Sequence, residues 1–331
     1  MAFKISVVVT TYNNEKTIQK CLESLVNQKL PPDQYEIIVV DGNSTDKTCK
    51  IVESFSKNSK VSIKLLQQKG KGISAARNTG IKAATGDWII LIDADAYASE
   101  DWLIEYLRCF NNAEERVGYI WGPTFPSNFE NIISRALYGL GYSRLAHGAN
   151  IAYNKKALED VGFFDEEFIG RGDEVVVNVK MENKGYKSKK CERALVYHEF
   201  PTSVVKFLKL QYWGGYWRHR LQQKYFTSEQ RKFYYFKLIL MLLFLGLFLS
   251  IPYYLLLSGI LGVLFLILFF GALSSIFLAY LKFVLKIDPK VDLKSFIIGI
   301  PIILLGQVFR LFGEVKGLLK LYNRDKRSVK S

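Results

Sequence analysis

One apolar run constrains this chain more than any other feature of its sequence. Between two lysines, the 44 residues 238–281 include no Asp, Glu, Lys, Arg, His, Asn or Gln. A single helix of this length would measure ~66 Å, about twice the ~30 Å hydrocarbon core of a bilayer. The run therefore predicts a transmembrane helical hairpin that turns near Ser258 and Gly259. A hairpin buried in a soluble core is the alternative, but helices in soluble cores usually keep a polar edge.

Basic residues gather on both sides of this run. Residues 1–200 hold 26 basic and 26 acidic residues, whereas the remainder holds 19 and 5, which accounts for the whole net charge of +14. Residues 200–237 combine eight basic residues with twelve aromatic ones. That mixture suits an RNA-stacking surface, but beside a membrane hairpin it indicates an interfacial, juxtamembrane helical segment over 201–237 that binds anionic lipids. The balanced charge of the first 200 residues argues against a nucleic-acid partner.

The last part of the chain, residues 282–331, is predicted to contain a basic loop, a third apolar helix and a basic tail. The apolar stretch 296–309 is short for a membrane crossing, and lysines and arginines flank it on both sides. Since such flanks favour the cytoplasmic side, we expect a multi-pass protein of the cell membrane in which this helix lies at the interface. Three crossings are the alternative.

Strand and helix patterns alternate through the domain predicted for residues 1–200. The β-rich runs are 5–10, 36–40, 62–66 and 88–92, and the helical ones are 15–28, 46–55 and 73–84. This order predicts an α/β fold with a mostly parallel central sheet and helices on both faces. Ser44 or Thr45 is the expected N-cap of the second helix. In such folds, ligands bind at the carboxyl ends of the strands.

Polar residues follow three of these predicted strands. Thr10 ends the first, Asp41 follows the second, and Asp93 and Asp95 follow the fourth. Two carboxylates two residues apart on an extended chain point to one face, where they repel each other unless a cation lies between them. Oxygen ligands suit Mg²⁺ or Mn²⁺, which in turn bind a diphosphate. Solvated turn aspartates are the alternative reading.

Two common nucleotide-binding loop motifs are absent from the sequence. No G-x-x-x-x-G-K-[ST] occurs, and no G-x-G-x-x-G follows the first strand, which argues against a dinucleotide dehydrogenase. Arg77 lies on a helix that opens after Gly70 and Gly72. Its guanidinium suits a phosphate or Asp93, with a surface salt bridge as the alternative.

The four cysteines, Cys21, Cys49, Cys109 and Cys191, are widely spaced and form no C-x-x-C pair. This spacing predicts reduced, buried thiols rather than disulfides or a zinc site. The N-terminus offers no run long enough for a signal peptide. Together these features predict that the first domain lies in the cytoplasm.

Six short motifs, in this order, resemble the family 2 glycosyltransferases of the GT-A fold: residues 7–13, 39–46, 75–80, 93–95, 148–150 and 162–165. The likeness covers residues 4 to about 200. It implies an inverting enzyme that takes a sugar from a nucleoside diphosphate donor.

The resemblance also implies roles for individual residues on the donor side. Thr10 and Tyr12 would line the base pocket, Asp41 would hold the nucleoside, and Asn13 would be a further donor-binding residue. Arg77 would support the nucleotide side.

Further roles concern the metal. Asp93 would contact ribose or metal and Asp95 would bind metal. His198 matches a position where some relatives place a third metal ligand, although a lone histidine is often structural.

Two departures from the family pattern bear on the acceptor. Where many relatives have Gly-Glu-Asp, this chain has Gly172, Asp173 and Glu174, so the catalytic carboxylate is either of the last two, or both are helix-capping groups. An acceptor hydroxyl needs a general base, whereas an acceptor phosphate is already anionic. The Gln-x-x-Arg-Trp motif of processive synthases is broken after Gln211, which disfavours polymerisation.

These observations predict a metal-dependent transferase that moves one sugar to a polyprenyl phosphate or a lipid-linked glycan at the membrane. The alternatives are transfer to a hydroxyl of an envelope glycan or glycolipid, and a membrane protein that binds nucleotide sugar without turnover.

Overall fold

Seven strands form the central sheet, in the order β3-β2-β1-β4-β8-β6-β9. The computed structural model describes residues 5–141, 147–168, 172–229, 231–232 and 293–328, and the predicted hairpin lies outside them. The strands are β1 Ile5–Thr11, β2 Tyr35–Asp41, β3 Ser62–Gln67, β4 Trp88–Asp93, β6 Val117–Trp121, β8 Ile151–Asn154 and β9 Lys187–Lys190. The four strands predicted from sequence are confirmed to within one residue at each end.

The sheet is mixed but mostly parallel. Strands β3, β2, β1 and β4 run parallel, β8 runs antiparallel to both β4 and β6, and β9 is parallel to β6. Successive residues of β1 are buried on opposite faces, because Val7 and Val9 join one apolar cluster and Val8 joins another. A sheet buried on both faces requires helices on both sides.

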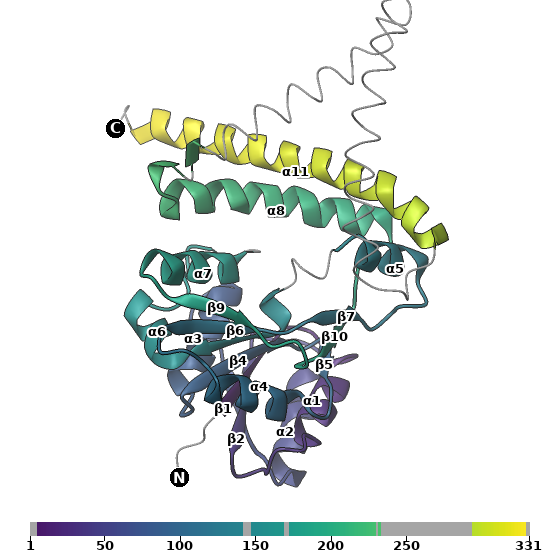
Figure 1. Ribbon diagram of the computed structural model, residues 1–331, viewed down its shortest axis with the longest axis vertical. Helices are drawn as coiled ribbons and strands as arrows, with labels where there is room; N and C mark the ends of the chain where they lie inside the picture. The colour runs from purple at the N-terminus through teal and green to yellow at the C-terminus, as the bar shows by residue number, and fades with distance from the viewer. Residues whose placement is uncertain (1–4, 142–146, 169–171, 230, 233–292, 329–331) are drawn as a thin grey trace, which may run out of the picture.

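The helices meet this requirement (Figure 1). One face packs against α1 Ile18–Val26, α2 Thr48–Asn58 and α4 Trp102–Asn111. The other packs against α3 Ile73–Ala83, α6 Lys155–Val161 and α7 Asp173–Asn183. The α/β architecture expected from sequence is therefore confirmed. The expected N-cap of α2 is wrong, since Lys47 occupies that position and its side chain makes no capping hydrogen bond.

A second, three-stranded sheet stands beside the first. It has the order β5-β10-β7, with β5 Ala96–Ala98, β10 Val196–His198 and β7 Thr124–Pro126. Strand β5 begins three residues after the last residue of β4, so the loop between them carries Ala94 and Asp95. Pairing of β10 with β5 places His198 opposite Ala96. This small sheet thus brings a distant histidine to the end of β4.

A disulfide corrects the cysteine prediction. Cys109 and Cys191, 82 residues apart, are joined, whereas Cys21 and Cys49 are free. Sequence spacing did not reveal the pair because α4 and the segment after β9 meet only in the folded domain. Disulfides are rare in the cytosol of mesophiles, so the cysteines no longer support a reducing compartment.

Two long helices lie side by side at one end of the molecule (Figure 1). They are α8 Val204–Tyr225 and α11 Leu293–Ser328, and α11 also packs against α5 Ile132–Gly139. A Cβ on Gly313 would lie 1.8 Å from the Tyr212 carbonyl oxygen, so only glycine permits this approach. Gly306 similarly faces Phe207 and Gly317 faces His219, which means that the helices run in the same direction.

The apolar stretch 296–309 forms part of α11, where Ile302 is buried in a cluster with Phe207 of α8 and Leu137 of α5. Among the described helices, none combines the length and apolar character needed to cross a bilayer.

Candidate active site

The strand ends bring the predicted acidic residues to one edge of the sheet. On β1, Thr10 pairs with Asp93 of β4, and Thr11 pairs with Asp41 of β2. Asp41 and Asp93 therefore lie two strand spacings apart, roughly 10 Å. The edge between them is wide enough for a ligand with several polar groups.

Asp93, Asp95 and His198 form a compact group on this edge. One ligand atom from each lies within 4.8 Å of the others. His198 Nε2 is 3.1 Å from Asp95 Oδ1 and 3.6 Å from Asp93 Oδ2. All three side chains are partly exposed, so an ion can reach them from solvent.

The orientation of His198 fits a cation ligand. Its Nδ1–H donates to the Glu199 carbonyl oxygen at 2.9 Å, which leaves Nε2 facing the two aspartates. Burial lowers the pKa of His198, but hydrogen bonds to Asp93 and Asp95 outweigh this effect and raise it well above 6.5. The two carboxylates suit Mn²⁺ or Mg²⁺, and the imidazole, a ligand of transition metals, favours Mn²⁺, so these residues fit the predicted cation.

Arg77 joins this group to a second pair of carboxylates. Its guanidinium is only 3% exposed, which rules out the surface salt bridge considered above. Its Nη1 lies 2.6 Å from Asp173 Oδ2 and 3.7 Å from Glu174 Oε2, and its Nη2 lies 3.6 Å from Asp93 Oδ1. Of the two partners considered for Arg77, a phosphate and Asp93, the structure shows Asp93 within ion-pair distance. Asp93 thus lies between the arginine and His198.

Asp173 and Glu174 differ in their surroundings. The Asp173 side chain is 3% exposed and the Glu174 side chain is 16% exposed. Burial raises the pKa of Asp173, the Arg77 guanidinium opposes this rise, and Glu174 adds to it. Asp173 is therefore occupied by the arginine, whereas Glu174 retains access to a ligand.

The loops after β1 and β2 brace each other. Asn13 has a positive φ of 53°, its Oδ1 accepts from Thr45 N at 2.8 Å, and its own N–H donates to Ser44 Oγ. Asp41 is buried and accepts from Ser44 N at 2.9 Å. Ser44 and Thr45 are thus used between loops, which explains why neither caps α2. The Tyr12 ring, at 61% exposed, is free to stack on a ligand.

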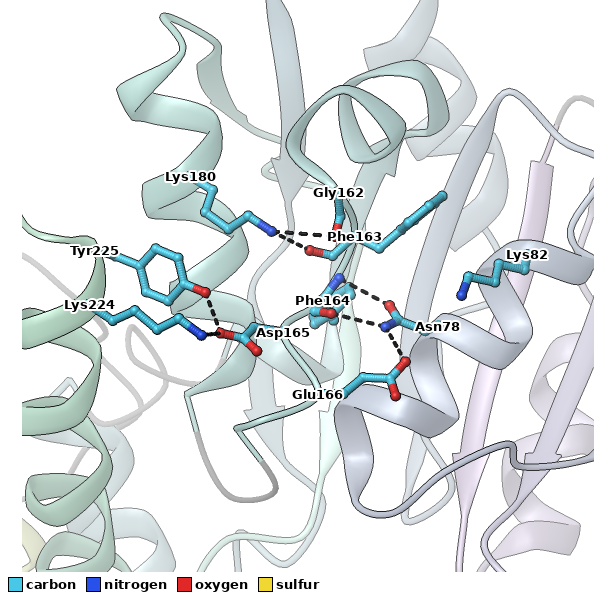
Figure 2. A pocket seen from close by; sticks show the side chains of 10 residues that line it. All are labelled: Asn78, Lys82, Gly162, Phe163, Phe164, Asp165, Glu166, Lys180, Lys224 and Tyr225. Carbon is cyan, nitrogen blue, oxygen red and sulfur yellow. Dashed lines mark hydrogen bonds and ion pairs between the residues drawn. The ribbon is translucent and has the colours of Figure 1, made fainter. Parts of the chain in front are cut away.

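Phe164, which had no role in the sequence analysis, packs against Arg77. The Phe164 ring lies beneath its guanidinium, 5.5 Å from ring centroid to Cζ. Figure 2 shows Asn78 facing Phe164 and Glu166 beside an open pocket of about 420 Å³. Residues 162–165 were noticed as a family motif, but their partners on α3 and α8 are far away in sequence.

Comparison with known protein families decides the class. The family described as "Glycosyl transferase family 2" matches residues 6–162, and "Glycosyl transferase family group 2" matches residues 88–282. The chain belongs to the family 2 glycosyltransferases. As a member of this family, it is an enzyme that transfers sugar from a nucleotide sugar.

Curated relatives of this glycosyltransferase include two archaeal enzymes. A dolichyl N-acetyl-alpha-D-glucosaminyl phosphate 3-beta-D-2,3-diacetamido-2,3-dideoxy-beta-D-glucuronosyltransferase of Methanococcus voltae is 29% identical over 62% of this chain and 70% of its own. Glycosyltransferase AglE of Haloferax volcanii is 29% identical over 51% and 58%. A poly(ribitol-phosphate) beta-glucosyltransferase of Bacillus spizizenii is 41% identical over 34% of this chain and 17% of its own.

A solved structure shares the fold over nearly the whole chain. The mannosyltransferase PcManGT of Pyrobaculum calidifontis, in complex with GDP-Man and Mn²⁺, has a TM-score of 0.65, 18% identity, and coverage of 96% of this chain and 88% of its own. This likeness supports the GT-A architecture.

Proposed function

We propose that this glycosyltransferase is a metal-dependent, inverting enzyme that transfers one sugar to a lipid-linked acceptor at a membrane surface. The observation that carries the proposal is the grouping of Asp93, Asp95 and His198 at the same sheet edge as Asp41. The structure of PcManGT with Mn²⁺ and GDP-Man lends support, because it has the same fold.

The donor would lie along this edge. Thr10, Tyr12 and Asn13 would face the base, Asp41 would accept hydrogen bonds from the nucleoside, and the diphosphate would lie near Asp93. Bound to Asp93, Asp95 and His198, a divalent cation would offset the charge that grows on the departing diphosphate. Arg77 would add positive charge from the other side of Asp93.

The transfer itself needs few protein groups. An acceptor oxygen would bond to the anomeric carbon as the bond from that carbon to the diphosphate oxygen breaks, which inverts the configuration. With a hydroxyl acceptor, Glu174 would take the proton, because it is the more accessible of the two helix-end carboxylates. Asp173 would hold Arg77 in place.

The membrane assignment rests on the helix pair. The exposed large apolar side chains of the described residues include Val205 and Trp213 of α8 and Leu305 and Phe312 of α11. Exposed lysines, Lys209 among them, lie on the same helices. Apolar side chains mixed with basic ones suit the interface of an anionic bilayer. The predicted hairpin at 238–281 would add a firm anchor.

One of the relatives supports a lipid-linked acceptor. The Methanococcus enzyme's name gives a dolichyl phosphate-linked sugar as its acceptor, whereas the Bacillus enzyme's name gives a polymer, poly(ribitol phosphate). The test is to incubate membranes that contain the full chain with labelled nucleotide sugars and Mg²⁺ or Mn²⁺. Mass spectrometry of the extracted lipids then identifies the product. Release of nucleoside diphosphate without any labelled lipid would contradict the lipid acceptor.

Replacing Glu174 separates the two acceptor chemistries. With a hydroxyl acceptor, Glu174→Gln removes the base, and turnover falls by about 10²–10⁴. With a phosphate acceptor, the loss stays below about tenfold, because the attacking oxygen is already anionic. Turnover of the wild type and of Glu174→Gln is measured as the rate at which the lipid product identified above forms. Glu182→Gln, on the same helix, is the matched control.

A further inference from the structure

The C-terminal end of α8 is fastened to the catalytic domain by polar contacts. Lys224 Nζ lies 2.8 Å from Asp165 Oδ2, and the Tyr225 hydroxyl donates a short hydrogen bond to the same oxygen (Figure 2). Lys224 also lies 2.8 Å from Glu167 Oε2. We call Asp165, Lys224 and Tyr225 the α8 clasp.

Apolar contacts beside the clasp reach α7, the helix that begins with Asp173 and Glu174. One buried cluster joins Leu221 of α8, Val176 of α7 and Phe168, which precedes α7 in the chain. The ring of Phe168 also meets Trp217 and Tyr225, with centroids 6.0 and 6.1 Å apart. Because Val176 lies three residues after Asp173 on α7, α8 packs directly against the first turn of that helix.

Helix α3 holds the same segment from the other side. Ser74 Oγ donates to the Phe168 carbonyl oxygen at 2.8 Å. Asn78 and the Phe164 backbone exchange two hydrogen bonds of 3.0 Å. Ser74 and Asn78 are four residues apart and flank Arg77, so the residues that grip this segment and the one that binds Asp173 share a face of α3. Residues 164–168 are therefore held between α8 and α3, the helix that carries Arg77.

We propose that Asp165 is a positioning residue for sugar transfer: through the clasp it anchors α8 against residues 164–168 and α7, and so fixes Arg77, Asp173 and Glu174 in their reactive arrangement. This inference rests on the proposed function. A displacement of about 1 Å in a catalytic group costs up to about 100-fold in rate, so a remote anchor has a kinetic effect.

Asp165 must carry a negative charge to hold Lys224, and its surroundings keep it ionised. Its side chain is 11% exposed, and although burial raises its pKa, hydrogen bonds from Lys224 and Tyr225 bring that pKa below its ordinary value. Asp165 therefore stays ionised at neutral pH. Asp165→Asn keeps the size of the side chain and removes the charge that holds Lys224.

A second aspartate provides a matched control. Asp160 Oδ1 lies 2.8 Å from Lys184 Nζ, and the Tyr186 hydroxyl donates to Asp160 Oδ2 at 3.2 Å. It thus has the same two partner types as Asp165, but those partners lie at the far end of α7 and not on α8.

The experiment compares the full-length wild type, Asp165→Asn and Asp160→Asn in membranes. We expect Asp165→Asn to lower kcat about tenfold while KM for the nucleotide sugar and the affinity for Mn²⁺ stay within about twofold. Amide hydrogen exchange at Val175 to Val177 should quicken in this variant alone. Asp160→Asn should change none of these quantities, and Tyr225→Phe should lower kcat by a smaller factor.

Three results would overturn the inference: an unchanged kcat in Asp165→Asn, the same loss in Asp160→Asn, or a parallel loss of Mn²⁺ affinity. If Asp165→Asn does not fold, Lys224→Met and Tyr225→Phe decide, and normal turnover in both rejects the role. A wild type that transfers no sugar would instead refute the proposed function, while the exchange measurement still reports whether the clasp orders α7.

Discussion

Arg77 lies between two groups of carboxylates, one at the strand ends and one at the start of α7, and the two groups differ in how their charge is balanced. At the strand ends, Asp93 and Asp95 are 29% and 39% exposed and face one histidine. At the start of α7, Asp173 is buried against the arginine at 2.6 Å. The first group has negative charge left for an external cation, whereas the buried carboxylate of the second, Asp173, is paired with the arginine inside the protein. Similar residues are thus open to a ligand in one place and paired inside the protein in the other.

Removing a carboxylate from the strand-end group should have the largest effect. Asp95→Ala deletes a proposed cation ligand, and we expect transfer to fall at least about 1,000-fold, or about 4 kcal/mol, with the melting temperature nearly unchanged. Radiolabel transfer and thermal unfolding measure the two quantities.

The control for this variant is Asp101→Ala, whose side chain is 55% exposed and pairs with Lys29 on the surface. Undiminished turnover in Asp95→Ala would refute its role as a cation ligand.

At the start of α7, removing the arginine that pairs with Asp173 should lower the stability of the protein. Arg77→Met leaves Asp173 buried without its arginine, and we expect the free energy of unfolding to fall by about 3–5 kcal/mol. Chemical denaturation measures it. Arg108→Met removes an arginine that is 62% exposed and pairs with Glu105, and should cost at most about 1 kcal/mol. Equal losses in the two variants would abolish the distinction between the groups.

The smallest effect concerns pH. Since the pKa of His198 without a cation lies well above 6.5, a cation must displace its proton at neutral pH. The affinity for Mn²⁺ should therefore rise about tenfold per pH unit up to that raised pKa and then level off. Calorimetric titration at several pH values tests this.

The folding stability of the protein without metal should change with pH in the opposite direction to the Mn²⁺ affinity. There, protonated His198 contributes stability that is fully present below pH 6.5 and fades as the pH rises through the folded-state pKa. An affinity for Mn²⁺ that does not vary between pH 6 and 8 would exclude His198 as a ligand.

Sequence was most informative where local pattern decides structure. Strands β1 to β4 were predictable because each is a short run rich in apolar and β-branched residues, and their order placed Asp41, Asp93 and Asp95 at one edge. The short strands β5, β7 and β10 were not, since three residues carry no periodicity. The sequence motif suggested His198 as a ligand, but only pairing of β10 with β5 brings it beside Asp95.

Contacts between distant segments escaped prediction. The Cys109–Cys191 disulfide spans 82 residues, and Asp165 meets Lys224 and Tyr225 about 60 residues later in the chain. No local pattern records such pairings. The same holds for α2, where Ser44 and Thr45 serve the neighbouring loop rather than the helix.

The position of Asp93 sets a limit on how this enzyme can be redesigned. Among the described residues, it alone is shared by the histidine cluster and the arginine network. A substitution there would disturb both sets of contacts together. Asp41, two strands away, belongs to neither set. Efforts to change the accepted donor should therefore begin on the Asp41 side of the sheet edge, where selection can act on one property at a time.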